Sequence, residues 1–374
     1  MPVRSRRANQ GKAPVQGTAS PDTGAHHAVR EVAGGRWLVL GKDGRLSAYA
    51  LGDEGVLRWT ESRPGSSEWA GPELLPVAGL TSLVVAQGPD GFVHFVGRRA
   101  VHADGGPPAV DLVGATQFQT GRPVTQWRSL GNPHGEQAKA ALLGVPTAAV
   151  DAAGMVHVFV RNESGGLHLR CEKAGGKWEA WQDLKLRRVQ DGTAVVTTTS
   201  GRVDVLVPAA GATLLLSRRE SGGAYQQDQD IPFAHTPGSA VALETAQDRV
   251  TYYWADESTG GVVAYRPGTW AIPLGGYPST GPVAAMRVML DGYDCTVLAH
   301  GTPDGQVMLT ACGTENEGGG VWWSPTGENC TGGPALAHDA YGRVVLALIG
   351  RDGELRIARQ NRESGLALDP SVQV

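Results

Sequence analysis

The stretch VPTAAVDAAGMVHVFVRNESGGLHLRCEKAGGKWEAWQDL, Val145 to Leu184, decides the fold. It contains an apolar run, a turn at Gly154, an alternating run from Val156 to Val160, a Gly-Gly turn, a third run and a tryptophan-rich segment. Short apolar runs separated by glycine turns are typical of antiparallel strands. The stretch therefore predicts a four-stranded meander.

The same pattern recurs along the chain. Glycines that open the third predicted strand are spaced by 45, 50, 44 and 48 residues, at Gly166, Gly211, Gly261, Gly305 and Gly353. Repeats of about 40–50 residues are those of β-propeller blades. Two upstream copies begin near Arg36 and Leu80, and we expect the second to carry an insertion from Gly105 to Gln126. The count is then seven.

Residues 29–374 thus give copies of about 49 residues each, the length of one blade. We predict an all-β protein, a single seven-bladed β-propeller of four-stranded antiparallel blades over this range. The last copy lacks a tryptophan strand after Gln360. We expect either the segment SGLALD, residues 364–369, or the N-terminal stretch near Val29 to complete it.

Composition agrees with a soluble globular chain rich in turns. The 374 residues include 53 Gly and 23 Pro with 6% aromatic residues, and the formal net charge is -4. A charge of this sign gives no reason to expect nucleic acid, and no apolar run is long enough to span a membrane. Ala, Gly, Val and Arg are frequent while Lys and Ile are scarce, which suggests a bacterium of high GC content.

Residues 1–28 contain several basic side chains and no apolar core, so we expect a disordered basic tail and no secretory signal. A cytoplasmic location is the default expectation, and signal-independent export is the alternative. None of the four cysteines forms a CxxC pair, which indicates neither a zinc site nor a redox motif. Cys295 and Cys312 lie on adjacent predicted strands and could face each other.

The order of residues from Pro146 to Trp181 resembles the repeat of the tachylectin-2-like and fucose-binding PLL-type propeller lectins. The resemblance implies that sugars bind in shallow pockets between adjacent blades, with aromatic side chains of the tryptophan strand helping to form them. The predicted outer strands differ between copies, and Tyr225 stands where other copies have Trp. We therefore expect one or two binding sites rather than seven equal ones.

Tryptophans on the predicted outermost strands are the candidate ligand-binding residues: Trp59, Trp127, Trp181, Trp270 and Trp322. Each could fill the wedge that widens between blades, or its exposed face could stack on the C–H face of a sugar. Trp178 and Trp181 would lie on opposite sides of a regular strand. Trp322 and Trp323 are adjacent, so we expect one of them to face outward.

A second group of candidates lies late on the predicted innermost strands, which line the central channel: Gln87, Asp151, Thr198, Glu244, Arg287 and His338. One interpretation is a wet structural channel. The other is a site at the channel mouth for a small acidic or polar ligand, formed by Gln87, Glu244, Arg287 and His338, with the histidine available as an acid or base near neutral pH.

The sequence contains no nucleophile elbow, Walker loop, Rossmann fingerprint or zinc-protease motif, and it indicates no cofactor or metal. We therefore predict a non-enzymatic recognition module whose partner is a carbohydrate or another small polar ligand. The alternatives are a biosynthetic enzyme or accessory protein that uses the channel mouth, and a protein-docking scaffold.

Overall fold

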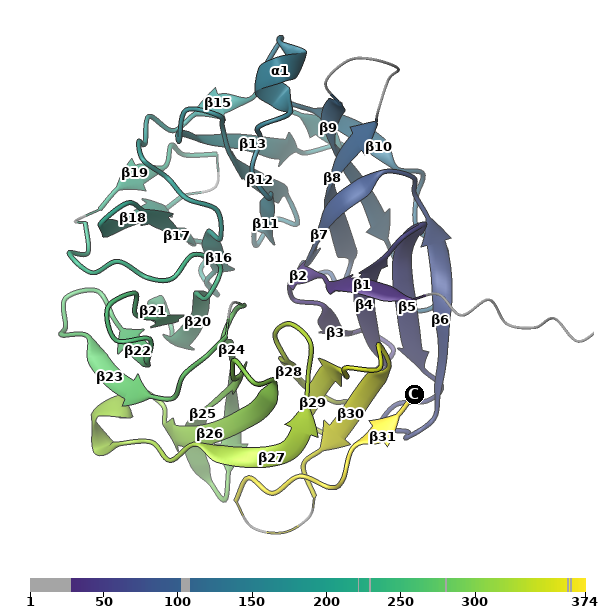
Figure 1. The fold of residues 1–374 in the computed structure, drawn as a ribbon, viewed down its shortest axis with the longest axis vertical. Coiled ribbons are helices and arrows are strands. Elements are labelled where there is room, and N and C mark those ends of the chain that lie inside the picture. Colours follow the sequence, from purple (N-terminus) through teal and green to yellow (C-terminus); the bar gives the residue numbers. More distant parts are fainter. Residues whose placement is uncertain are drawn as a thin grey trace, which may run out of the picture.

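The computed structural model describes residues 28–374 apart from 102–107, 221, 229, 280, 362 and 364. The predicted tail at residues 1–28 lies outside this range except for its last residue. Seven antiparallel sheets are arranged radially around a central channel (Figure 1). The fold is the seven-bladed β-propeller that the repeat predicts. No helix in the described part of the chain is long and apolar enough to span a membrane.

Each blade is built from consecutive strands. Blade one contains β1 (Val29–Val32), β3 (Leu38–Leu40), β4 (Leu46–Gly52), β5 (Gly55–Glu61) and β6 (Trp69–Pro76). Blade two contains β2 (Gly34–Gly35), β7 (Leu80–Gln87), β8 (Val93–Val101), β9 (Ala109–Gln117) and β10 (Arg128–Gly131). Blade three contains β11 (Thr147–Val150), β12 (Val156–Arg161), β13 (Leu167–Lys173), β14 (Lys177–Trp178) and β15 (Gln182–Asp183).

The other blades have four strands each. Blade four contains β16 (Ala194–Thr197), β17 (Val203–Ala209), β18 (Ala212–Arg218) and β19 (Gln226–Gln227), and blade five contains β20 (Val241–Ala246), β21 (Arg249–Ala255), β22 (Val262–Tyr265) and β23 (Ile272–Gly275). Blade six contains β24 (Ala284–Leu290), β25 (Tyr293–Gly301), β26 (Gln306–Gly313) and β27 (Ser324–Asn329). Blade seven contains β28 (Ala335–His338), β29 (Val344–Ile349), β30 (Leu355–Arg359) and β31 (Val372–Gln373). Two short helical turns, α1 (Gln137–Ala140) and η1 (Glu317–Gly319), lie in connections.

The second strands show why the sequence forms blades. In β12, Val156 through Val160 are all buried, because side chains on both faces of the sheet pack against neighbouring blades. The hairpin that follows β17 turns at Gly211, whose φ of 82° lies in the left-handed region that glycine tolerates. The β-branched runs and the glycine turns together specify the blade.

Three expectations need correction. Residues 109–117, part of the supposed insertion, form β9, the third strand of blade two. The outer strand of blade seven is β31 at the C-terminus, while Val29 pairs with β4 of blade one. Cys295 pairs with Gly313 and Thr296 with Cys312, so the two cysteines point to opposite faces of the sheet. All four cysteines are free.

No strand is exchanged between the first and the last blade within the described residues. Side chains close the ring instead. Buried Glu61 of β5 accepts a hydrogen bond from the Arg359 guanidinium of β30 at 2.7 Å, and its other carboxylate oxygen accepts one from the Leu46 N–H at 3.0 Å. One apolar cluster spans this seam, with residues such as Leu46 and Leu57 on one side and Ile349 and Ile357 on the other.

Candidate functional site

Trp59 is not a binding residue of the predicted kind. It lies on β5, the third strand of blade one rather than the outermost, and its side chain is only 1% exposed. The outermost strand, β6, begins at Trp69 after a loop that the repeat pattern alone does not reveal. A ligand could not reach the Trp59 ring without opening the blade.

Trp127 and Trp181 are half-buried between blades. The Trp127 ring packs against Phe95 with centroids 6.2 Å apart, and the Arg170 guanidinium lies 5.8 Å from the Trp181 ring centroid. Trp178 and Trp181 contact the same apolar cluster, because β14 ends at Trp178 and β15 begins after Trp181, so no regular strand joins them. These three rings pack the interfaces between blades.

Trp270 and Trp322, by contrast, are 88% and 89% exposed. The neighbouring Trp323 turns inward, donates a hydrogen bond from Nε1 to the Leu274 carbonyl at 2.9 Å, and packs edge-on against His300. The expectation that one of the two adjacent tryptophans faces outward is confirmed. Trp323 anchors the loop, and Trp322 is held out at the rim.

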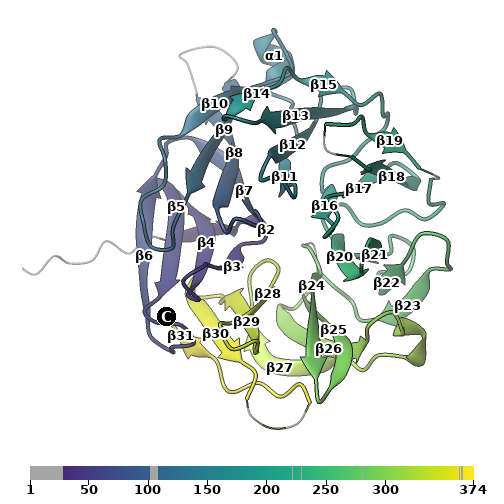
Figure 2. The ribbon, with the colours of Figure 1, turned by 180° about the vertical axis from the view of Figure 1, so that it is seen from behind.

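Trp322 borders a groove between blades six and seven. The cavity has a volume of about 490 Å³. Its lining residues come from β26, β27, β30 and the segment that leads to β31, and Figure 2 shows these strands in neighbouring blades. Its lining combines apolar and polar side chains: Leu309, Thr310, Ala311, Trp322, Ser324, Pro325, Thr326, Glu328, Ala358, Leu366, Leu368, Asp369, Pro370 and Ser371. A volume of this size is typical of small-molecule sites.

The polar groups of this groove have unused hydrogen-bonding capacity. Neither the Glu328 nor the Asp369 carboxylate has a hydrogen-bond or ion-pair partner within the described part of the chain, and no described Lys or Arg lines the groove. The Thr310 hydroxyl is buried and unpaired. An unsatisfied buried hydroxyl is costly unless a ligand or water pairs with it. Apart from Trp322, sequence reasoning missed these residues.

The channel candidates act mainly as links between blades. Gln87 donates to the Leu40 carbonyl of blade one at 2.8 Å, and His338 Nε2 lies 2.9 Å from the Arg287 carbonyl of blade six. The Glu244 carboxylate accepts hydrogen bonds from the N–H and the hydroxyl of Thr199 in blade four, at 2.8 and 2.9 Å. Their side chains therefore hold adjacent blades in register.

The predicted channel-mouth site is assembled only in part. Gln87, Arg287 and His338 line one cavity of about 580 Å³ in the channel, and Glu244 is not among its lining residues. Asp151 and Thr198 are buried within turns, each only 2% exposed.

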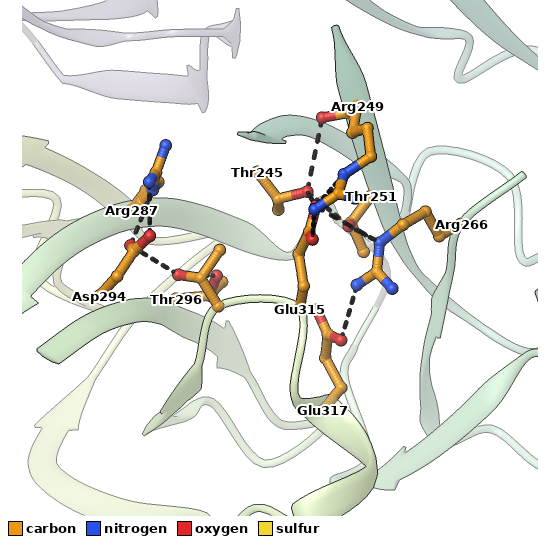
Figure 3. A network of polar contacts seen from close by, with 10 residues as sticks. Thr245, Arg249, Thr251, Arg266, Arg287, Asp294, Thr296, Glu315 and Glu317 are labelled. Carbon is orange, nitrogen blue, oxygen red and sulfur yellow. Dashed lines mark hydrogen bonds and ion pairs between the residues drawn. The ribbon is translucent and has the colours of Figure 1, made fainter. Parts of the chain in front are cut away.

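Arg287 is ion-paired with Asp294 in its own blade (Figure 3). This pair belongs to a wider set of charged contacts at blades five and six. Arg266 Nη2 of blade five lies 2.8 Å from Glu317 of blade six, and Arg249 pairs with Glu315 (Figure 3). Each acid in this network already has a cation, so the network joins the blades and leaves no free charge for a ligand.

Sequence reasoning also missed a buried Asp–His–Cys arrangement in blade three. His157 Nε2 lies 3.2 Å from the Asp151 carboxylate, and His157 Nδ1 lies 3.1 Å from Cys171 Sγ. Arg218 Nη2 of blade four donates to the same Asp151 oxygen at 2.7 Å. Burial raises the pKa of the Cys171 thiol to about 12, so it stays protonated and is not a nucleophile. The arrangement is structural.

No protein-family model matches the sequence, and no curated protein is similar to it. Solved structures do match its shape. The BP39L lectin from Burkholderia pseudomallei superimposes with a TM-score of 0.67 at 13% identity, over 93% of this chain and all of the lectin. A PL25 ulvan lyase, a polysaccharide lyase, gives 0.55 at 11% identity over 92% of this chain and 96% of the lyase.

A protein of unknown function from Dyadobacter fermentans gives a TM-score of 0.51 at 15% identity, over 76% of this chain and 97% of that protein. Identities this low show that the fold is shared and do not by themselves assign an activity. The similar structures include both a lectin and a lyase, so the shared fold does not identify a ligand for this chain. The chain is thus a propeller with the architecture of a known lectin.

Proposed function

We propose that this protein is a lectin that binds an uncharged carbohydrate in the groove between blades six and seven. The observation that carries the proposal is Trp322, whose indole is 89% exposed at the border of a cavity of about 490 Å³. A large exposed apolar ring beside a hollow is characteristic of a binding site.

The indole suits a sugar because one face of a pyranose presents C–H groups. Stacking on that face removes apolar area of both partners from water, and the ring loses little conformational entropy since Trp323 already anchors the loop. Leu366, Leu368 and Pro370 provide further apolar surface opposite.

Polar recognition would come from the free carboxylates of Glu328 and Asp369, which accept hydrogen bonds from sugar hydroxyls. Thr310 adds a buried hydroxyl that lacks a partner. Both charged groups in the groove are acids, so an acidic sugar would meet like charge in a partly enclosed site. This charge distribution supports a neutral sugar over a uronic or sialic acid.

The other blade interfaces support a single principal site. Trp59 is buried and Trp127 and Trp181 are packed between blades, while blade four has Tyr225, whose hydroxyl lies 3.0 Å from the buried His157. The proposal thus differs from a multivalent lectin with one equivalent site per blade.

A glycan array with the full-length protein, followed by calorimetry on the best ligand, tests the proposal. Trp322→Ala is the test variant and Trp270→Ala is the matched control, because Trp270 is equally exposed and is not among the residues that line the groove. We expect Trp322→Ala to weaken binding by about 2 kcal/mol, about thirtyfold in Kd, and Trp270→Ala to leave the affinity unchanged.

Three results would contradict the proposal. Absence of binding to any neutral glycan by the folded wild-type protein would remove the carbohydrate function, and equal losses in both variants would move the site away from the groove. Cleavage of the bound glycan by the wild-type protein would replace a lectin with an enzyme.

A further inference from the structure

The N-terminal segment places an extra strand inside the channel. β2 pairs in parallel with the inner edge of β7, Gly34 opposite Val84 and Gly35 opposite Val85, and becomes the fifth strand of blade two (Figure 1). Glycine is required here: Gly35 has a φ of 72°, and a Cβ on it would lie 2.4 Å from the Val85 carbonyl oxygen. The sequence Gly-Gly thus lets the chain lie flat against the wall.

The next residue, Arg36, is held at this wall by its backbone. The Arg36 N–H donates to the Val85 carbonyl at 3.0 Å, and Arg36 lines the channel cavity of about 580 Å³. The guanidinium has no hydrogen-bond or ion-pair partner among the residues that the structure describes. The side chain is open to the water of the channel, yet protein surrounds it, and this burial lowers its pKa.

The rest of the cavity offers no negative charge. Its walls are mostly small and apolar, and none of the described lining residues is Asp or Glu: besides Arg36 the ionisable ones are Arg287 and His338. Arg287 is already paired with Asp294, and both ring nitrogens of His338 face backbone carbonyls. Arg36 is therefore the unpaired charge of the cavity.

We propose that the central channel binds a small molecule carrying an oxyanion, a carboxylate or a phosphate, through the Arg36 guanidinium. An arginine stays protonated even where burial disfavours its charge, so the cavity retains a permanent positive charge. An oxyanion accepts two parallel hydrogen bonds from a guanidinium, and apolar walls strengthen that attraction because they screen it less than bulk water.

This site is distinct from the carbohydrate groove. Its ligand is an anion, whereas the two carboxylates of the groove disfavour an anion there. The two proposals can fail separately, because the channel residues around Arg36 and the groove residues around Trp322 have no member in common.

Calorimetry and thermal unfolding of the full-length protein test the proposal, with inorganic phosphate and succinate as probes and sodium chloride at matched ionic strength as the reference. The variants are Arg36→Gln, Arg36→Lys and, as a control, Arg63→Gln, which removes an exposed arginine of a surface loop. We expect wild type and Arg63→Gln to bind at least one probe and to gain thermal stability from it. Phosphate and succinate distinguish the two oxyanion classes.

Arg36→Gln should lose at least tenfold in affinity for the preferred probe, and Arg36→Lys should lose less because it keeps the charge without the planar fork. Without anion, Arg36→Gln should unfold at about the same temperature as wild type, since the Arg36 side chain is open to water and has no hydrogen-bond or ion-pair partner among the described residues. Binding of neither probe by wild type, equal binding by Arg36→Gln, or the same response to chloride would each overturn the proposal.

Discussion

The groove between blades six and seven and the central channel are two hollows of similar size with opposite character. Among the described residues, the groove has an exposed indole and two carboxylates without a partner, while the channel has small apolar walls and one guanidinium without a partner. We therefore propose that the same scaffold selects a neutral polyol at its rim and an anion at its axis. Charge placement rather than cavity size separates the two ligand classes.

Both hollows occur where the chain departs from its repeat. The groove depends on Trp322 in the connection from β26 to β27 and on the segment between β30 and β31. The channel site depends on β2, a strand that the other blades lack. Regular blades pack against each other, and irregular segments create the sites, as in other scaffolds where loops carry function.

The largest effect that we expect is a loss of unfolding free energy at acid pH, through protonation of His235. Burial lowers the pKa of His235 to about 4. Thr213 donates its hydroxyl proton to the Phe233 carbonyl and so accepts from His235 Nδ1–H, while the buried Nε2 has no partner among the described residues, so a second proton on the ring would be buried unpaired.

In the unfolded chain this histidine has a pKa of about 6.5, so the unfolded state binds the proton more tightly and the stability contribution is lost as pH falls from about 6.5 to about 4. We expect His235 to account for about 3 kcal/mol of unfolding free energy across this window. Urea unfolding at several pH values should show a weaker pH dependence for His235→Gln than for wild type. Parallel curves for the two proteins would refute the assignment.

Affinities of each variant for both ligand classes, the neutral glycan and the anion, distinguish the two hollows. Trp322→Ala should lose about thirtyfold in affinity for the neutral glycan, because the stacking surface is gone, and keep wild-type affinity for phosphate or succinate. Titration calorimetry with both ligands measures the two effects. A loss of anion binding in Trp322→Ala would show that the two hollows are not independent.

The next largest effect that we expect is on glycan affinity, when the acidic charges of the groove are removed. Glu328→Gln and Asp369→Asn keep the shape and remove one charge each, so each should weaken binding of the neutral glycan by about 1.5 kcal/mol, roughly tenfold, through loss of a charge-assisted hydrogen bond. The double variant should tolerate an acidic sugar better than wild type on the same array. Unchanged affinity in both single variants would leave the carboxylates outside the site.

Thr310→Val should have the smallest effect. Removing the unpaired buried hydroxyl should weaken glycan binding by about 0.5–1 kcal/mol, two- to fivefold, and leave the sugar-free protein as stable as wild type or more so. Chemical denaturation with and without the glycan separates the two outcomes. A destabilised sugar-free protein would mean that the hydroxyl is paired in solution and is not reserved for a ligand.

The repeat predicted the fold because its signals are local. A glycine that needs a left-handed φ, such as Gly211 or Gly305, marks most of the described hairpins, although the β20–β21 hairpin turns at Asp248 instead. The assignment of Trp59 to an outer strand was wrong because loop length decides which strand is outermost. A loop separates β5 from β6 in blade one, and its length follows no repeat.

The candidate sites were less predictable because they depend on contacts between blades. The sequence does not distinguish Trp181 from Trp322. In the structure the Arg170 guanidinium lies over the Trp181 ring, whereas Trp322 is 89% exposed. Trp322 was named as one of the outer-strand tryptophans, and its adjacency to Trp323 correctly predicted that one of the two faces outward. Arg36 was missed because no strand was predicted at Gly34 and Gly35, where the structure has β2; glycine in a strand often marks close backbone approach.

The seam between blades one and seven gives the ring an unusual mechanical property. No backbone ladder joins the first blade to the last among the described residues, although β2, from the N-terminal stretch, pairs with β7 of blade two. Separation of the first blade from the last would therefore break side-chain contacts such as Glu61 with Arg359 and no strand pair of the described residues. The ring can therefore open at this seam while each blade keeps its strand pairing, so opening of the ring and unfolding of a blade are separate events.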